Sequence, residues 1–173
     1  MKRLLLLVYI FLFGVNAFCQ TEEPTIIFLF RHAEAQFPPY KEDPPNPDLN
    51  NAGSQRAQLL KRTLTATGIT EAFSTQRKRT IQTIKPLAEE LELEIQIYDG
   101  KQLEALAEQL KSKKGRIAVS GHSNTTPQLV KLLGGDPGEP INEKTQFDRI
   151  YVVTLVDGDA ISTVLLKYGS NYD

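Results

Sequence analysis

Residues 25–34 read TIIFLFRHAE, a run of β-branched and apolar residues that ends at an arginine and a histidine. A continuous run of this kind predicts a strand that is buried on both faces. Such strands belong to parallel sheets that are covered by helices on both sides. The stretch therefore favours an α/β fold in which Arg31 and His32 follow the carboxyl end of a central strand.

A second stretch, residues 116–123, repeats this arrangement with the letters RIAVSGHS. The chain has only two histidines, and His122 follows this apolar run as His32 follows the first. Because ligands of parallel sheets bind at the carboxyl ends of the strands, we expect both imidazoles to lie beside Arg31. Imidazoles and a guanidinium together suit a phosphoryl group, since they offer a nucleophile, hydrogen-bond donors and fixed positive charge.

The rest of the chain alternates between helical and strand-like patterns, which is typical of the α/β class. Asn50 or Asn51 can cap one helix, and Thr126-Pro127 predicts the start of another. Strands are predicted over residues 69–74, 94–98 and 117–120, with helices over 75–91 and 103–110 between them.

The last two apolar runs, residues 149–156 and 160–167, flank Asp157-Gly158 and predict a hairpin. We therefore predict a three-layer α/β sandwich. It has a mostly parallel central sheet, helices on both faces and an antiparallel edge near the C-terminus.

The N-terminus has the composition of a secretory signal peptide. A short basic start precedes the apolar run 4–13, and Ala17-Phe18-Cys19 resembles a cleavage site. We predict that residues 1–19 are removed, which leaves residues 20–173 as a single exported domain, periplasmic or secreted. Lipid anchoring at Cys19 is the alternative, although Phe18 argues against it because lipid-attachment sites carry a small residue there.

Composition excludes several classes of partner. The formal net charge is −1 and no basic stripe occurs, which argues against a nucleic-acid partner. Cys19 is the only cysteine, so the mature chain needs no disulfide. No second apolar stretch is long enough to span a membrane. Two histidines without an H-x-x-x-H spacing also disfavour a metal site.

A third stretch, residues 73–83, places three basic residues just after a predicted strand and at the start of a helix. Cations are unfavourable at a helix N-terminus, so they indicate either a solvated face or an anion held from outside. We interpret Arg77 and Lys78 as solvated surface and Arg79 as the functional residue.

These motifs resemble those of the histidine phosphatase superfamily, whose fold is shared with cofactor-dependent phosphoglycerate mutase. Residues 31–34 resemble the Arg-His-Gly signature, with Ala33 in place of the commonest glycine. Residues 75–83 are similar to the second motif, and Gly121-His122-Ser123 to the Gly-His-Ser/Thr motif. Residues 48–53 match a weaker pattern of the family. The four motifs occur in order across the mature chain.

The resemblance implies a role for each matching residue. His32 would be the nucleophile, while Arg31, Arg79 and His122 would bind the phosphoryl oxygens, with no cofactor. Asp99 would be the general acid that protonates the leaving oxygen. Glu34 and Glu143 are rivals for that role.

The resulting expectation is an exported, metal-independent phosphomonoesterase that acts on a small phosphorylated substrate such as a sugar phosphate. One alternative is a non-catalytic phosphate- or phosphosugar-binding domain with the same fold. Another is a phosphohistidine or phosphoprotein phosphatase.

Overall fold

The computed structural model describes residues 23–36 and 46–170. These residues form six strands, four α-helices and one 3-10 turn. The elements in chain order are β1 (Thr25–Arg31), α2 (Asn51–Leu64), η1 (Thr65–Thr67), β2 (Glu71–Thr75), α3 (Lys78–Glu90), β3 (Ile95–Tyr98), α4 (Leu103–Lys111), β4 (Gly115–Gly121), α5 (Thr125–Leu132), β5 (Arg149–Val156) and β6 (Asp159–Lys167).

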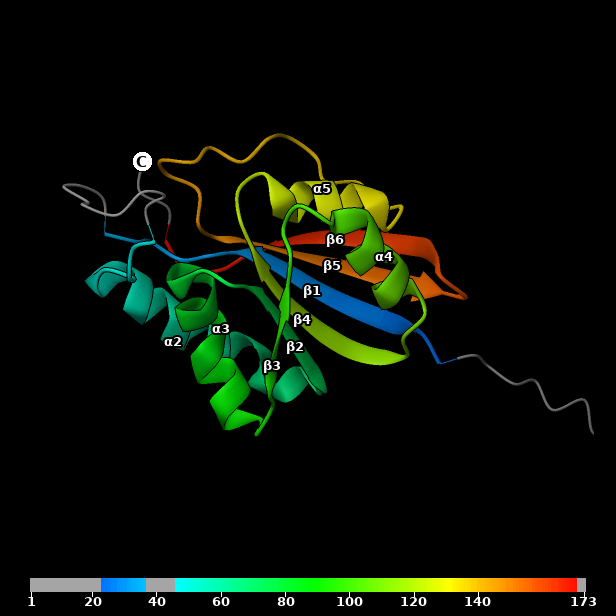
Figure 1. Ribbon diagram of the computed structural model, residues 1–173, viewed down its shortest axis with the longest axis horizontal. Helices are drawn as coiled ribbons and strands as arrows, with labels where there is room; N and C mark the ends of the chain where they lie inside the picture. Colours follow the sequence, from blue (N-terminus) through cyan, green and yellow to red (C-terminus); the bar gives the residue numbers. More distant parts are fainter. Residues whose placement is uncertain (1–22, 37–45, 171–173) are drawn as a thin grey trace, which may run out of the picture.

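The strands form one mixed sheet in the order β3-β2-β4-β1-β5-β6 (Figure 1). Strands β3, β2, β4 and β1 run parallel to one another, whereas β5 pairs antiparallel with β1 and β6 antiparallel with β5. The predicted α/β class, with a mostly parallel sheet and an antiparallel C-terminal edge, is confirmed. Strand β1 lies between β4 and β5, so its end is central in the sheet.

Helices cover both faces of the sheet, and strand β1 contributes to both cores. Ile27 and Leu29 join the core under α4 and α5, whereas Phe28 and Phe30 join the core under α2 and α3. Because side chains on both faces of β1 are buried, residues 26–30 are all apolar. Each such side chain contributes about 1.5–3 kcal/mol when it is fully buried.

The predicted hairpin at the C-terminal end is also confirmed. Asp157 has a φ of 53° and Gly158 a φ of 85°, so both central residues are left-handed. This is the backbone of a type I′ turn, whose twist matches that of the strands it joins.

Two predicted helix starts were wrong by a few residues. Thr75 is the last residue of β2, and α3 begins only at Lys78. Helix α5 begins at Thr125 rather than at Thr126-Pro127. The early start of α5 has a local reason. The Thr125 hydroxyl accepts a hydrogen bond from the His122 backbone N–H at 2.9 Å, which closes a turn before Thr126.

The predicted signal peptide, residues 1–19, lies outside the described residues. Within residues 23–36 and 46–170, no helix combines the length and the apolar character that a membrane span requires.

Candidate active site

The two histidines lie side by side because of the pairing between β1 and β4. Arg31 is paired with Gly121 in the parallel register, and the His32 backbone N–H donates to the Gly121 carbonyl at 2.9 Å. The two imidazole centroids are 5.4 Å apart, with their planes at 66°. The structure thus brings both predicted histidines and Arg31 to one edge of the sheet.

The His32 ring has a defined tautomer. Its Nδ1 lies 2.8 Å from the carbonyl oxygen of Ala33, and because a carbonyl only accepts, Nδ1 carries the hydrogen. Nε2 is therefore left with a lone pair. Burial lowers the pKa of His32 to about 3; the hydrogen bond to Ala33 opposes this shift, and the charges of Arg31 and Arg79 reinforce it. His32 is neutral at physiological pH.

Arg31 is held by backbone carbonyls from the late segment 142–147. Its Nη1 donates to the carbonyl of Gln146 at 2.9 Å and to that of Asn142 at 3.4 Å, and Nη2 donates to that of Glu143 at 2.8 Å. Its guanidinium carbon lies 4.1 Å above the centre of the Phe147 ring. These contacts fix the orientation of the guanidinium.

The Nε of Arg31 is buried and meets no hydrogen-bond acceptor among the described residues. A buried donor without a partner is unfavourable by about 1–3 kcal/mol, and more when the group is charged. Burial lowers the pKa of Arg31 to about 10, and the charge of Glu143 opposes this shift. The arginine remains a cation, so an arriving anion would supply the acceptor that Nε lacks.

His122 is held by side chains. Its Nδ1 lies 3.4 Å from an Nη2 of Arg79, and its Nε2 lies 3.0 Å from the hydroxyl of Thr75. Burial lowers the pKa of His122 to about 4, with further lowering by the charges of Arg79, Arg77 and Arg31. The second imidazole is therefore also neutral, and positive charge surrounds both rings.

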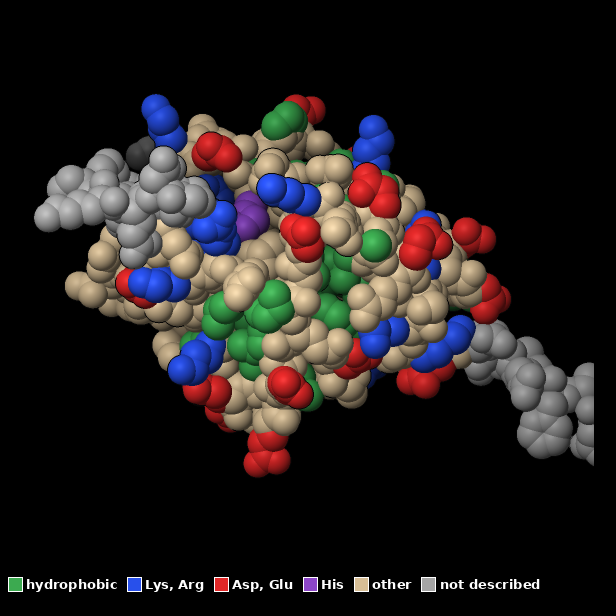
Figure 2. All heavy atoms as spheres, viewed as in Figure 1, with side chains coloured by type: hydrophobic (Ala, Val, Ile, Leu, Met, Phe, Trp, Pro, Cys, Tyr) green, Lys and Arg blue, Asp and Glu red, His purple; other side chains and the backbone are tan. Residues whose placement is uncertain are grey.

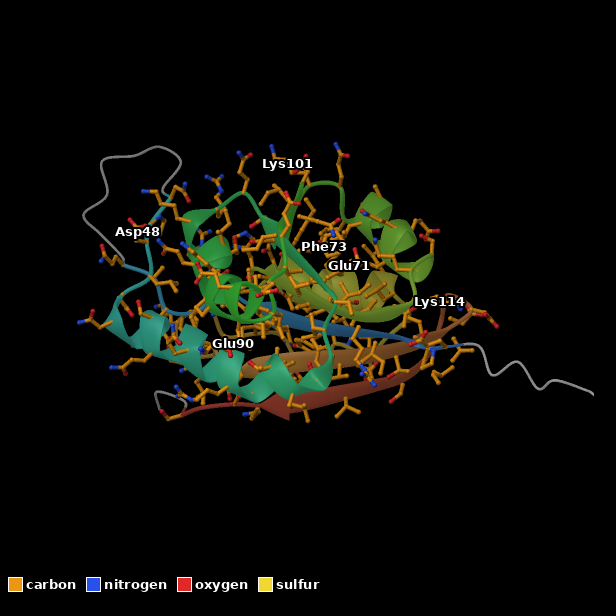
Figure 3. All side chains as sticks on the ribbon, turned by 90° about the horizontal axis from the view of Figure 1, so that it is seen from below. Asp48, Glu71, Phe73, Glu90, Lys101 and Lys114 are labelled. Carbon is orange, nitrogen blue, oxygen red and sulfur yellow. The ribbon has the colours of Figure 1, made fainter. Side chains whose placement is uncertain are left out.

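These groups line a cavity of about 1370 Å³ at the carboxyl ends of β1, β2, β3 and β4. Figure 2 shows histidine surface at the floor of this hollow, beside basic side chains. Lys101 projects from the segment that follows β3 and lines the cavity (Figure 3). Arg31, His32, Arg79, Asp99 and His122 all contribute to the lining. The cavity is much larger than one phosphoryl group.

The segment that follows His32 is anchored by both α2 and α3. The Ala33 N–H donates to the Thr83 hydroxyl at 2.9 Å, and the Asn50 N–H donates to the Glu34 carbonyl at 3.0 Å. A Cβ added to Gly53 would lie 2.0 Å from that same carbonyl oxygen. Asn50 caps α2 through Gly53, as predicted. The weak motif at residues 48–53 thus positions the backbone next to His32.

Glu34 is not placed as a proton donor. Its buried carboxylate accepts from Nε and Nη2 of Arg56, and the shortest distance is 2.7 Å. Arg56 also donates to the carbonyls of Tyr168 and Ser170. This ion pair joins the loop after His32 to α2 and to the C-terminal segment. Glu34 therefore has a structural partner, which removes it from the candidates for the general acid.

Asp99 and Glu143 remain as candidates for the general acid. Both side chains are exposed and both line the cavity. One Asp99 oxygen accepts from the Lys101 backbone N–H at 2.9 Å, and Glu143 accepts from the Ser123 hydroxyl. No carboxylate is among the charges that shift the pKa of either imidazole. The structure places Asp99 at the cavity without singling it out as the acid.

Three contributors were missed from the sequence: the carbonyls of the 142–146 segment, the Phe147 ring and the hydroxyls of Thr75 and Thr80. Backbone carbonyls leave no trace in residue identities. Both threonines lie within the motif at residues 73–83, Thr75 at the end of β2 and Thr80 in the first turn of α3, so their place in that motif was the available signal. Among the described residues, no group of three His, Cys, Asp or Glu side chains could hold a metal ion.

Comparison with known proteins agrees with this geometry. Residues 27–100 match the model of the histidine phosphatase superfamily (branch 1). No curated protein gave a significant match. Solved structures share the fold at low sequence identity. The protein histidine phosphatase SixA complexed with tungstate is 18% identical, with a TM-score of 0.65, over 82% of this chain and 96% of that chain.

Two other solved structures with the same fold are described as a phosphatase and a mutase. A mycobacterial glucosyl-3-phosphoglycerate phosphatase is 10% identical, with a TM-score of 0.62, over 84% of this chain and 98% of that chain. A phosphoglycerate mutase from Bacillus anthracis str. Sterne is 11% identical, with a TM-score of 0.61, over 84% and 93%. The family match over residues 27–100 and the order of the motifs support the assignment of the chain to the histidine phosphatase superfamily, and the solved structures show that it shares the fold of these proteins.

Proposed function

We propose that this chain is an exported phosphomonoesterase that hydrolyses a phosphate ester through a phosphohistidine on His32. The observation that carries the proposal is the 2.8 Å contact between His32 Nδ1 and the Ala33 carbonyl. It puts the hydrogen on Nδ1 and leaves the Nε2 lone pair for attack. The lowered pKa keeps that lone pair available across the physiological range.

The reaction has two displacements at phosphorus. In the first, Nε2 of His32 forms a bond to phosphorus while the bond to the leaving oxygen breaks, and that oxygen takes a proton from the general acid, for which Asp99 and Glu143 are the candidates. In the second, water attacks phosphorus and gives a proton back to that carboxylate while the P–N bond breaks, which releases phosphate and restores the neutral imidazole. Arg31, Arg79 and His122 bind the oxygens that carry charge in both transition states. No metal is invoked in either step.

A phosphohistidine or phosphoprotein phosphatase is the second candidate. The charges that act on both imidazoles are cationic, and Glu34 is bound to Arg56. A site with little acid assistance favours substrates whose leaving group departs readily, and the imidazole of a phosphohistidine is such a group once it is protonated. The volume of the cavity, about 1370 Å³, is compatible with a phosphorylated side chain as well as with a small ester.

Trapping of the phosphoenzyme tests the nucleophile. The protein is mixed with a ³²P-labelled aryl phosphate and quenched within one turnover. We expect an acid-labile, base-stable label on the peptide that contains His32, and no label in His32→Ala. His122→Asn is the matched control, because it keeps the nucleophile and should still be labelled, more slowly. Label that persists in His32→Ala would contradict the assignment.

The same experiment separates an enzyme from a binding domain. Saturable binding of inorganic phosphate without label or turnover would support a non-catalytic phosphate-binding domain. A panel of sugar phosphates, phosphopeptides and a chemically phosphorylated histidine peptide then distinguishes the substrate classes by kcat/KM.

Export is proposed from the sequence of residues 1–19. Fractionation of expressing cells should find the protein outside the cytoplasm with Gln20 as its first residue. A lipid-modified Cys19 at the N-terminus, lost in Cys19→Ser, would support the anchored alternative instead.

A further inference from the structure

A buried row of hydroxyl groups connects His122 to the backbone at the start of α3. We propose that Thr75 and Thr80 are positioning residues that hold His122 in the tautomer with its hydrogen on Nε2, so that Nδ1 is the nitrogen presented to the phosphoryl group. The catalytic meaning of this arrangement rests on the proposed phosphatase function. The tautomer itself does not depend on that function.

The direction of the hydrogen bonds is set at the far end of the row. The Thr80 hydroxyl lies 2.8 Å from the Arg77 carbonyl and 3.0 Å from the Thr75 carbonyl. Because carbonyl oxygens only accept, the Thr80 hydrogen points to the backbone. The Thr75 and Thr80 hydroxyl oxygens are 2.8 Å apart, so the Thr75 hydrogen must point to Thr80.

This leaves the Thr75 oxygen as an acceptor toward His122. Its distance to Nε2 is 3.0 Å, so Nε2 must carry the hydrogen. An independent contact leads to the same tautomer. Arg79 Nη2 lies 3.4 Å from Nδ1, and a guanidinium offers only donors, so Nδ1 faces it with a lone pair. At 3.4 Å the Arg79 contact alone would be weak evidence for the tautomer, but it indicates the same tautomer as the hydrogen bonds of Thr75 and Thr80.

Burial makes this arrangement rigid. Thr75 is 4% exposed and Thr80 is 0% exposed, so both hydroxyls are largely shielded from bulk water. In addition, the Ser120 hydroxyl donates to the Thr80 carbonyl at 2.9 Å, which ties the start of α3 to β4. Hydrogen bonds in a low-dielectric interior are strong, and an unpaired hydroxyl there is costly.

The two histidines are thereby presented in opposite ways. His32 carries its hydrogen on Nδ1 and attacks through Nε2, whereas His122 carries it on Nε2 and presents Nδ1 beside Arg79. When a phosphoryl dianion binds, its charge offsets that of Arg31 and Arg79, so Nδ1 of His122 can take up a proton from water and, as an imidazolium, donate a hydrogen bond to a phosphoryl oxygen. The threonine row determines which nitrogen makes this contact.

Nitrogen NMR of the ring atoms in ¹⁵N-histidine-labelled protein tests the tautomer directly. Only two histidines are present, and the His32→Asn variant assigns the signals. We expect a pyrrole-type shift at Nε2 of His122 and at Nδ1 of His32. A pyrrole-type shift at Nδ1 of His122 in the ligand-free wild type would overturn the proposal without bearing on the phosphoenzyme.

Substitutions then test whether the threonines are responsible. Thr75→Val removes the acceptor and should give a mixture of His122 tautomers and a fall in kcat of about 10–100-fold, by analogy with the loss of the hydrogen-bond partners that orient metal-bound histidines. Thr80→Val frees the Thr75 hydrogen and should also admit the other tautomer. Thr75→Ser keeps the hydroxyl and should restore the wild-type shifts and kcat.

Thr126→Val is the matched control, because Thr126 is also buried and its hydroxyl donates to the Phe30 carbonyl. Its His122 shifts should equal those of the wild type. If Thr75→Val leaves the tautomer unchanged, the threonine row does not position the ring. If Thr75→Val does not fold, Thr80→Val and the wild-type spectrum still decide the question. If the His122 hydrogen is found on Nε2 but no phosphoenzyme forms, the proposed phosphatase function is refuted and the inference about the tautomer stands.

Discussion

The ends of strands β1 and β4 present similar residues by different means. At the end of β1, Arg31 and His32 are oriented by backbone carbonyls. At the end of β4, His122 is oriented by the side chains of Thr75 and Arg79. No substitution deletes a backbone carbonyl, whereas single substitutions can remove each partner of His122. The β1 end should therefore respond to changes in the fold, and the β4 end to changes in side chains.

The largest effect should come from breaking the Glu34–Arg56 ion pair, which holds the segment that follows β1. Arg56→Met leaves the buried Glu34 carboxylate without its partner and should lower the free energy of unfolding by about 3–5 kcal/mol. Urea unfolding followed by circular dichroism measures this. The double variant Arg56→Met with Glu34→Gln should recover part of the loss. A change below about 1 kcal/mol in the single variant would show that the ion pair does not hold this end together.

Replacement of Arg31 tests the carbonyl-held guanidinium itself. Arg31→Lys keeps the charge but loses the planar group that contacts three carbonyls and the Phe147 ring. We expect kcat/KM to fall about 10²–10³-fold, as when one preorganised oxyanion donor is lost. Arg79→Lys is the matched variant at the β4 end. Equal losses of thermal stability in both variants would remove the distinction between the two ends.

The pH dependence of stability compares the two imidazoles. The pKa of His32 is lowered to about 3 and that of His122 to about 4, against about 6.5 in an unfolded chain. Because the unfolded state binds protons more readily, these groups add stability above pH 6.5, and that stability is lost as pH falls toward 3. Unfolding in urea at several pH values should show a shallower acid loss in His32→Asn than in wild type. Parallel curves would contradict the burial of a neutral His32.

The smallest effect concerns the proton donor. For an aryl phosphate with an acidic phenol, Asp99→Asn should change kcat less than about tenfold, because this leaving group needs little protonation. With an alkyl phosphate the loss should grow toward the usual contribution of a general acid, about 10²-fold or more. Glu143→Gln provides the comparison at the other candidate. If neither variant shows this dependence on the leaving group, both carboxylates are excluded as the acid.

Much of the fold followed from residue patterns, because β1 and β4 are apolar on both faces and the Asp157-Gly158 turn has distinctive residues. Helix starts did not follow, since that of α5 depends on where the Thr125 hydroxyl bonds. The two histidines and Arg79 could be singled out from their positions after predicted strands, whereas the role of each as nucleophile or phosphate ligand came from the family resemblance. The ion pair of Glu34 could not be foreseen from the sequence, because its partner Arg56 lies 22 positions away on another element.

The contacts of Arg31 also have a consequence for how the protein is made. Its guanidinium partners lie 111 to 115 positions later in the chain. A ribosome adds about 5–20 residues per second, so Arg31, His32 and Arg79 are synthesised several seconds before those carbonyls. A nascent chain that carries the family-matched residues 27–100 still lacks both His122 and the groups that orient Arg31. The proposed phosphate site can therefore form only after most of the polypeptide has been made.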